Sequence, residues 1–492
     1  MQSKLLVYNT LSHTKEVFVP LHTPHVGMYV CGPTVYGPPH LGHARGAIAF
    51  DIIYRYLTYS GYKVRYVRNI TDVGHLENDS DHGEDKIAKK ARIENLEPME
   101  IAQLYTNLYH RDMDALHVKR PSIEPLATGH IGEQIEMVKH LLSKGWAYES
   151  KGSVYFDVNK YAKHHSYGEV SGRVLDDLLS GTRTLDGQDE KKDAADFALW
   201  KKASIEHIMQ WHSPWGKGFP GWHIECTAMS TKYLGHTFDI HGGGMDLLFP
   251  HHESEMAQSK GCHGHSPAKY WLHNNMVTIN GQKMAKSLGN FITLEQLFTG
   301  KNELLQQSFS PMAVRFFILQ AHYRSTIDFS NDALKAASKA YYKLLNTYMT
   351  CNKLVHNPSN DLNIALDSEI AKQCTECMMS MDDDFNTGAA IGYLFQLSKH
   401  INAFYNKQAD INTISNTTFE VLIKVFNDMF TEILGFAPDT SAHGWAKALL
   451  PIYQKAKDEK RYDTVDALRQ VYKQQGLLIK DMKTGTDWQY EE

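Results

Sequence analysis

Residues 27–53 have the sequence GMYVCGPTVYGPPHLGHARGAIAFDII, and this stretch decides the fold class. Its apolar start, residues 27–31, predicts a short buried strand that ends at a Gly-Pro pair. A turn rich in glycine and proline follows, and apolar residues then recur at helical spacing as far as Gly61. Residues 63–70 (KVRYVRNI) predict a second strand. Strand, glycine turn, helix and strand together predict a parallel α/β sheet, in which ligands bind beyond the carboxyl ends of the strands.

The composition restricts the class of protein. The chain has 492 residues, which at roughly 100–200 residues per domain predicts three or more packed units. Its 51 Lys and Arg against 56 Asp and Glu give a formal charge of −5, which excludes a generally basic nucleic-acid binder but not a local basic face. The N-terminal segment has no apolar signal-peptide core, and no run reaches the roughly 18–20 apolar residues that span a bilayer. With only six cysteines and no disulfide framework, we expect a cytoplasmic protein without a membrane segment.

Changes of pattern along the chain predict its domains. Residues 93–204 interrupt the α/β pattern with helices and a short β segment, and the pattern resumes near Pro220. Residues 277–282 carry the Asn-Gly signature of a tight hairpin, and residues 331–436 have the periodicity of a helical bundle. The expected boundaries are 1–92 and 205–265 for the two halves of the α/β domain, 93–204 for the insertion, 266–330 for a junction domain, 331–436 for the bundle and 437–492 for a small mixed unit.

Two short motifs suit the binding of phosphates. His40-Leu-Gly42-His43 lies at a loop-to-helix junction, where free backbone N–H groups and the helix dipole attract anions and Gly42 lets ATP approach the backbone. Alone, this motif is equally well explained by histidines that only cap the helix. Lys283 and Lys286, in the motif KMAKS, add the positive charge that a transferring phosphorus centre requires.

A third motif, HGGGMD, follows another predicted strand. Gly243 and Gly244 would allow an adenosine to lie against the backbone, and Asp246 would accept hydrogen bonds from ribose hydroxyls. A plain glycine turn is the alternative interpretation. The presence of the two phosphate motifs favours nucleotide binding.

HLGH and KMAKS resemble the HIGH and KMSKS signatures of the class I aminoacyl-tRNA synthetases. Leu41 replaces Ile and Ala285 replaces Ser, which removes one hydroxyl but keeps both lysines. The resemblance implies a Rossmann-type parallel-sheet catalytic domain with an inserted connective domain, followed by an α-helical bundle and a small mixed C-terminal unit. It also implies that the catalytic residues are His40, His43, Lys283 and Lys286, and that Gly42, Gly243, Gly244, Asp246 and Lys286 bind ATP together with Mg²⁺.

Four further residues form a plausible set of metal ligands. His251 and Glu255 are four positions apart and therefore share one helical face, while Cys226 and Cys31 lie elsewhere in the chain. Two sulfurs, one imidazole and one carboxylate suit Zn²⁺. Spacing alone leaves a second interpretation open, in which the cysteines are small core residues and His251 and Glu255 an ordinary surface pair.

The motifs CGPTVYGPPHLGH, NITDV, PGWHIEC, FDIHGGG and FPHHE, in this order, resemble those of the cysteinyl-tRNA synthetases. The resemblance implies one zinc ion per chain, held by Cys31, Cys226, His251 and Glu255, with the adjacent His252 and Glu253 standing aside. It also implies that Trp222 packs beside the substrate cysteine and that Thr71 holds the amino-acid end of the substrate. The zinc selects cysteine over serine because it prefers a thiolate to a hydroxyl, so we expect no editing domain.

The same resemblance implies the partners. These are L-cysteine, ATP and cysteine tRNA, acted on by a monomer, with the C-terminal region reading the anticodon. Basic and aromatic residues of the last unit suit RNA contact, and the residues expected to make it are Arg461, Lys473 and Trp488. Two alternatives are a ligase that passes cysteine to an amino-sugar and a non-catalytic RNA-binding relative.

Two features depart from these assignments. Many relatives have NITDIDDKI, whereas this chain carries extra polar residues between Val73 and Asp85, which we interpret as a surface loop near the active-site rim. Cys374 and Cys377 lie in a Met-rich helical stretch and are interpreted as one turn of core helix.

Overall fold

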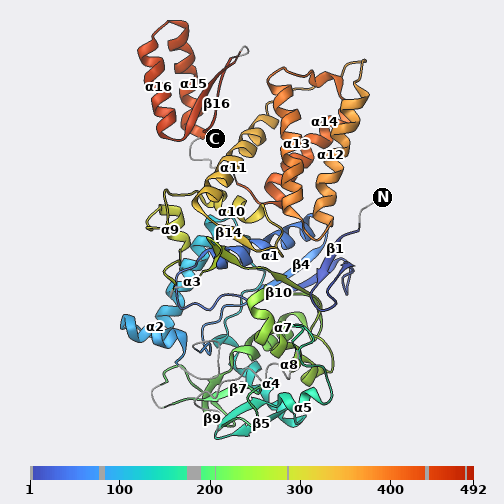
Figure 1. Cartoon of the computed structure of the whole chain (residues 1–492), viewed down its shortest axis with the longest axis vertical. Coiled ribbons are helices and arrows are strands. Elements are labelled where there is room, and N and C mark those ends of the chain that lie inside the picture. Colours follow the sequence, from blue (N-terminus) through green and yellow to red (C-terminus); the bar gives the residue numbers. More distant parts are fainter. Residues whose placement is uncertain are drawn as a thin grey trace.

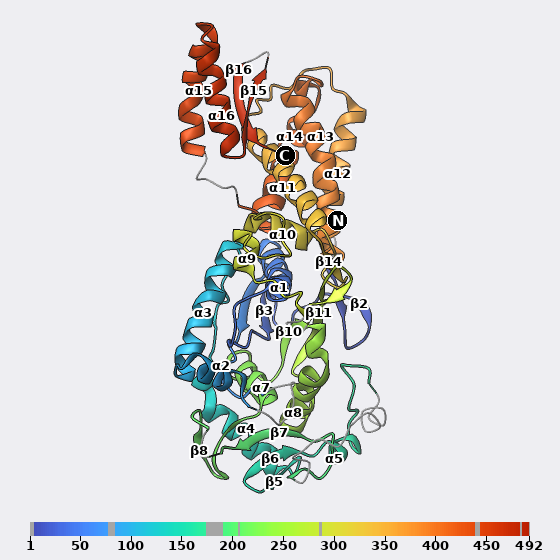
Figure 2. The same cartoon turned by 60° about the vertical axis from the view of Figure 1, so that its left-hand side comes forward.

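The structure is a computed structural model that describes residues 4–76, 84–173, 190–204, 207–284, 288–437, 443–482 and 485–491. The insertion lies at one end of the molecule and the parallel-sheet domain in the middle (Figure 1). The helical bundle and the C-terminal unit stand side by side at the other end, as a second view confirms (Figure 2). In the described part of the chain, no helix is both long and apolar enough to cross a membrane.

The central sheet has four parallel strands in the order β11–β10–β3–β4, which confirms the predicted fold class. These strands are β3 (His25–Val30), β4 (Lys63–Arg68), β10 (Phe238–Gly244) and β11 (Ala268–Asn274). From β3 the chain passes through α1 (Leu41–Tyr59) to β4 on one side, whereas β10 pairs with β3 on the other side. The loops that follow β3 and β10 therefore diverge at the carboxyl edge, which is where ligands bind in open α/β sheets.

The insertion is built around a separate antiparallel sheet with the order β5–β6–β7–β9–β8. Its strands are β5 (Ala147–Ser150), β6 (Ser153–Phe156), β7 (Phe197–Lys202), β8 (Trp211–Ser213) and β9 (Gly216–Pro220). The helices before and within it are α2 (Lys86–Glu94), α3 (Pro98–Ala115), η2 (Thr128–His130), α4 (Ile131–Ser143) and α5 (Val158–Ala162). Because β8 and β9 belong to this sheet, the insertion extends beyond residue 204 and the central fold resumes at α7 (Trp222–Leu234).

Short elements connect the sheet domain to the bundle. The hairpin predicted from Asn-Gly is present: Asn280 and Gly281 have φ values of 49° and 77° and join β12 to β13. β14 pairs with β12 in the same small sheet. The elements of this region are η4 (Met245–Leu247), η5 (Leu248–His252), α8 (Glu253–His263), β12 (Val277–Ile279), β13 (Gln282–Lys283), α9 (Leu294–Thr299), α10 (Pro311–Leu319) and β14 (Ile327–Phe329), and a hairpin of β1 (Leu6–Asn9) and β2 (Thr14–Val17) precedes the sheet.

The expected bundle and mixed unit follow. The bundle consists of α11 (Asn331–Cys351), α12 (Ile364–Asp382), α13 (Thr387–Tyr405), η7 (Ile411–Thr413), α14 (Asn416–Asn427) and η8 (Asp428–Ile433). The C-terminal unit consists of α15 (His443–Asp458), α16 (Tyr462–Gln474), β15 (Leu477–Met482) and β16 (Gly485–Tyr490). Cys374 and Cys377 are buried on α12, in agreement with their interpretation as core residues.

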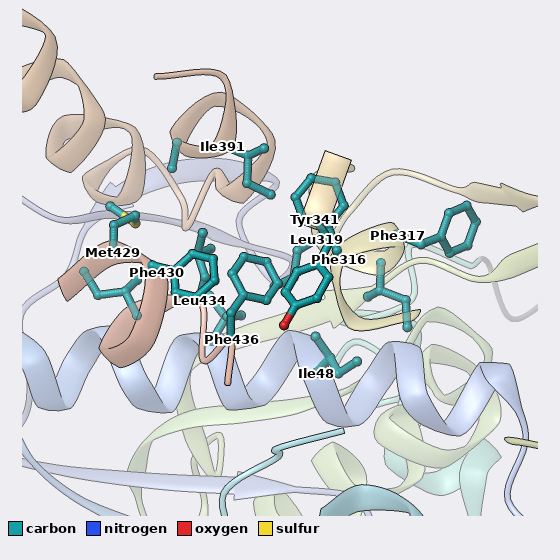
Figure 3. Packing of buried hydrophobic residues seen from close by; sticks show 14 of the residues in the cluster. Ile48, Phe316, Phe317, Leu319, Tyr341, Ile391, Met429, Phe430, Leu434 and Phe436 are labelled. Carbon is teal, nitrogen blue, oxygen red and sulfur yellow. The ribbon is translucent and has the colours of Figure 1, made fainter. Parts of the chain in front are cut away.

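One apolar core joins the bundle to the sheet domain. Ile48 on α1 faces a layer of aromatic side chains that includes Phe316 of α10, Tyr341 of α11 and Phe436 (Figure 3). The rings of Phe316 and Phe436 are stacked with centroids 5.7 Å apart. Burial of this kind stabilises the contact by roughly 25 cal/mol per Å² of apolar surface removed from water. The bundle is therefore packed directly on the helix whose first turn carries HLGH.

A buried ionic cluster lies beside this core. The Oδ2 atom of Asp51 accepts hydrogen bonds from Arg55 Nε at 2.8 Å and Arg315 Nη2 at 2.5 Å, and its Oδ1 atom accepts one from the Lys119 backbone N–H at 2.9 Å. Arg315 Nε donates to the carbonyl oxygen of Leu434 at 2.7 Å. Because these groups satisfy one another, the cluster fixes α1, α10 and the end of the bundle together.

Candidate active site

Four side chains from distant parts of the chain meet at the carboxyl edge of the sheet. Cys31 directly follows β3, Cys226 lies on α7, His251 lies in η5 and Glu255 lies in the first turn of α8. One ligand atom from each lies within 4.8 Å of the ligand atoms of the other three. The structure therefore brings together all four residues that were expected to hold a metal.

The electrostatics of this group indicate a site for a cation. Cys31 Sγ lies 3.7 Å from Cys226 Sγ and 3.5 Å from Glu255 Oε1, and Glu255 Oε1 lies 3.2 Å from His251 Nε2. Burial raises the pKa of the Cys31 thiol well above its ordinary value, and the neighbouring Cys226 and Glu255 raise it further. Burial also raises the pKa of Cys226. Ionised, these groups would repel one another, so the donor set fits a divalent cation with affinity for sulfur.

A second group of donors overlaps the first. Cys31, His241, His252 and Glu255 also have ligand atoms within 4.8 Å of one another, and His252 Nε2 lies 3.4 Å from Cys31 Sγ. His252 therefore lies against the donors, and the expectation that it is not a metal ligand stays a prediction. Phe249 is extended, with φ −139° and ψ 132°, so η5 is not a regular helix, and consecutive histidines are both buried against the cluster.

Glu253, the other residue expected to stand aside, has a structural role. Its carboxylate accepts hydrogen bonds from the backbone N–H groups of three residues of the insertion, at distances of 3.0–3.1 Å; these are Glu169, Val170 and Ser171. This carboxylate is therefore occupied in fixing the insertion to the start of α8. It belongs to neither group of candidate metal ligands.

The two residues expected to contact a substrate amino acid lie beside the donors. The indole of Trp222, at the start of α7, lies 4.5 Å from the ring of His251, measured between centroids. Thr71 Oγ1 donates to Glu225 Oε2 at 3.0 Å and accepts from Asn69 Nδ2 at 3.1 Å. Because Glu225 precedes Cys226, Thr71 is connected to the donor group through one residue.

The histidines of HLGH cap the first turn of α1. Gly42 N–H donates to His40 Nδ1 at 3.1 Å, and His40 N–H donates to His43 Nδ1 at 3.3 Å. The two rings are stacked with centroids 3.8 Å apart, and burial lowers the pKa of His43 to about 4. Helix capping therefore occupies one nitrogen, Nδ1, of each ring. It does not exclude a phosphate contact through the other nitrogen, because imidazole has two.

The start of the KMAKS motif lies next to HLGH. A Cβ atom on Gly42 would lie 3.6 Å from the side chain of Met284, and the Leu294 N–H donates to the Pro39 carbonyl oxygen at 3.0 Å. Lys283 ends β13 and is exposed. Lys286 lies outside the described residues. The expected roles of both lysines in ATP binding and catalysis stay predictions.

The glycines that end β10 lie close to neighbouring side chains. A Cβ atom on Gly242 would lie 2.2 Å from the ring of Phe50, and one on Gly243 would lie 2.7 Å from the ring of His252. A Cβ atom on Gly244 would lie 2.2 Å from Asp246 Oδ1. Asp246 is exposed at the same edge of the sheet as the donors. Nucleotide contact by these residues stays a prediction.

Sequence reasoning missed a ring of histidines around the donors. His223 Nδ1 lies 3.0 Å from His251 Nδ1, and His252 Nδ1 lies 2.8 Å from His273 Nε2. His241 Nε2 lies 2.9 Å from Glu255 Oε2. The chain has 27 histidines, and this count was the available signal, but their convergence depends on strand order.

The C-terminal residues expected to bind RNA differ in exposure. Lys473 is exposed, and Arg461 is half exposed with its Nε atom 2.8 Å from Glu459 Oε2. Trp488 is only 7% exposed and packs against Tyr490 with ring centroids 5.6 Å apart. Little of its ring is therefore open to solvent, and RNA contact by Trp488 stays a prediction. Contact by Arg461 and Lys473 stays a prediction.

Comparisons with known proteins define the class. Residues 17–339 match the family described as tRNA synthetases class I (C) catalytic domain, and residues 376–437 match the DALR domain. The fold is similar to that of Mycobacterium tuberculosis methionyl-tRNA synthetase in complex with methionyl-adenylate, with a TM-score of 0.60 at 13% identity over 90% of this chain and 96% of that chain. The fold and the matched domains are those of a class I aminoacyl-tRNA synthetase.

Relatives at high identity narrow the class. The chain is 61% identical to a cysteine–tRNA ligase of Cytophaga hutchinsonii and 56% identical to one of Bacteroides fragilis, in each case over 99% of both chains. The chain therefore belongs to the cysteine–tRNA ligase family.

Proposed function

We propose that this protein attaches L-cysteine to cysteine tRNA in two steps. In the first step, the cysteine carboxylate attacks the α-phosphorus of ATP, which gives cysteinyl-adenylate and pyrophosphate. In the second step, a terminal ribose hydroxyl of the tRNA attacks the adenylate carbonyl. The observation that carries the proposal is the convergence of Cys31, Cys226, His251 and Glu255 at the sheet edge that HLGH also borders.

The bound metal is proposed to be zinc, one ion per chain, held by these four residues. Two sulfurs, one nitrogen and one oxygen match the ligands that zinc takes in proteins, and zinc when bound would favour a substrate thiolate over a hydroxyl. The chain itself limits the space around the substrate side chain through Trp222 and places Thr71 near the amino-acid end. A site that requires a metal-bound thiolate reaches roughly 10⁴-fold discrimination between cysteine and serine without hydrolytic editing.

The phosphate side of the site is proposed to act by charge. His40, His43, Lys283 and Lys286 would stabilise the negative charge that develops on the triphosphate, and Mg²⁺ bound with ATP would add further positive charge. Gly42, Gly243, Gly244 and Asp246 are the proposed contacts of the nucleotide. The cysteine carboxylate is already ionised at neutral pH, so the first step needs no protein base.

The RNA is proposed to lie along the other end of the molecule. The bundle and the C-terminal unit stand side by side there, and the exposed Lys473 and Arg461 offer phosphate contacts. The six cysteines are all free thiols, which suits a reducing cytoplasm. We propose that a single chain carries the activity.

One experiment tests the proposal against both alternatives. The full chain is assayed for cysteine-dependent exchange of pyrophosphate into ATP and then for transfer of cysteine to cysteine tRNA or to an amino-sugar. Exchange followed by transfer to the tRNA is expected, because the similarity to the matched ligase covers 99% of this chain and so includes α11–α14 and the C-terminal unit. Transfer only to the amino-sugar would identify the other ligase, and RNA binding without exchange would identify a non-catalytic relative.

A further inference from the structure

The two ends of the polar insertion between Val73 and Asp85 are held together by backbone hydrogen bonds. Leu76 and Asp85 form an antiparallel bridge, and the Lys86 N–H donates to the His75 carbonyl oxygen at 3.0 Å. Asp85 then caps α2, because its Oδ1 atom accepts hydrogen bonds from the backbone N–H groups of residues 87 and 88 at 2.9 and 3.0 Å. Backbone pairing and helix capping therefore fix the position of His75.

Gly74, at the start of the polar insertion, lies in close contact with the turn before Trp222. Its φ value is +75°, a left-handed conformation that favours glycine. A Cβ atom at this position would lie 2.6 Å from the carbonyl oxygen of Pro220, two residues before Trp222. The close approach of the two backbones brings the next side chain, His75, onto the indole.

His75 and Trp222 form a parallel stack with ring centroids 4.0 Å apart and an angle of 11° between the planes. The imidazole is held at both nitrogens: Nδ1 lies 2.6 Å from Thr34 Oγ1, and Nε2 lies 2.7 Å from Lys86 Nζ. A lysine ammonium can only donate, so Nε2 accepts, and the proton on Nδ1 is donated to the threonine hydroxyl. His75 is 8% exposed, so the ring is fixed by buried contacts.

We propose that His75 is a positioning residue of the amino-acid pocket. The inference rests on the proposed function, in which Trp222 packs beside the substrate cysteine. The same indole contacts His251 at 4.5 Å, so a ring held at His75 sets the distance between the indole and the sulfur-binding donors. His75 directly follows Val73-Gly74, where this chain departs from the common pattern NITDIDDKI, and its ring thereby forms one side of the proposed pocket.

The test compares three variants as full-length, zinc-loaded proteins. His75→Ala removes the ring, His75→Gln keeps a polar end without a ring, and His75→Phe keeps a ring that can stack. His164→Ala is the matched control, because His164 also contacts a tryptophan, Trp146, at 5.7 Å but lies in the insertion domain. Zinc content and the KM values for cysteine and ATP are measured by pyrophosphate exchange.

The Ala and Gln variants are expected to raise the KM for cysteine by about tenfold, because the loss of an aromatic contact of this kind weakens binding by about that factor. The Phe and control variants should stay within about threefold of the wild-type KM, and the KM for ATP and zinc content should not change in any variant. If Ala does not fold, the comparison of Gln with Phe decides. Equal KM values for those two, or loss of zinc in Gln, would overturn the inference; absence of exchange in the wild type would instead overturn the proposed function.

Discussion

Two buried polar clusters lie in the same domain and differ in how their charges are balanced. Around Asp51, two guanidinium groups surround one carboxylate. Burial raises the pKa of Asp51, but Arg315 and Arg55 more than offset this, and the pKa lies below its ordinary value. Around Cys31, by contrast, burial and the neighbouring Cys226 and Glu255 all raise the thiol pKa.

This difference separates a structural cluster from a site. The Asp51 cluster is complete without any ligand, because each charge has an opposite charge within hydrogen-bond distance. Among the four donors around Cys31, the only pair that can carry opposite charges is His251 with Glu255, and only when the imidazole is protonated. The two thiolates have no cationic partner among the four, so the ionised set becomes compatible with a bound cation. The convergence of four donor atoms without enough opposite charge therefore marks the cluster around Cys31 as the one that fits a cation.

The largest expected effect comes from breaking the donor group. Cys226→Ser replaces a soft sulfur by a hard oxygen, so zinc retention should be lost, and cysteine-dependent pyrophosphate exchange should fall by about 10³-fold or more. Metal analysis and exchange on the same preparation check this. A Cys226→Ser protein that retains both zinc and wild-type exchange would remove the distinction between the clusters.

Breaking the Asp51 cluster should affect stability instead of metal binding. Asp51→Ala leaves two buried arginines without their carboxylate, which should destabilise the fold by about 3–5 kcal/mol. Thermal unfolding and zinc content measure the two effects separately. Asp114→Ala is the control, because Asp114 pairs with Arg120 at the surface and its loss should leave the Tm unchanged. Loss of zinc from the Asp51 variant before unfolding would contradict this assignment.

The loss of stability at acid pH should report the protonation of the Asp51 carboxylate. The folded pKa of Asp51 lies below its ordinary value of 3.8, so its contribution is fully present above pH 3.8 and is lost as the pH falls through the folded pKa. The Tm difference between the wild type and Asp51→Asn should therefore be constant from about pH 7 to pH 5 and shrink below about pH 4. A difference that grows towards acid pH would mean that the sign is wrong.

The smallest effect is expected from a buried thiol outside both clusters. Cys374 is 1% exposed, and burial raises its pKa to about 12, but it belongs to neither group of candidate metal ligands. Cys374→Ser should leave zinc content at one per chain and exchange within about twofold of wild type. Loss of a zinc ion in this variant would place a ligand on α12.

Local patterns were sufficient to predict much of the fold. The strand before the Gly-Pro turn, the Asn-Gly hairpin and the helical bundle all follow from spacing and turn residues within a short window. The limit of the insertion was not predictable in this way, because β9 belongs to the insertion sheet through its pairing with β7, a strand that ends at Lys202. Sheet membership is a property of long-range pairing.

The site was predictable only in part, for the same reason. The four donors were available from family motifs, whereas the inward position of His252 depends on the extended Phe249. The burial of Trp488 depends on tertiary contacts such as those of Asn346, whose side chain both donates to and accepts from the backbone of Tyr490. No spacing rule contains these contacts.

Zinc K-edge X-ray absorption, recorded on the protein alone and then with L-cysteine or L-serine, tests the central claim most directly. Two sulfur ligands with nitrogen or oxygen neighbours are expected without substrate, and cysteine but not serine should add a third sulfur. A spectrum that lacks protein sulfur, or one that cysteine leaves unchanged, would contradict the account.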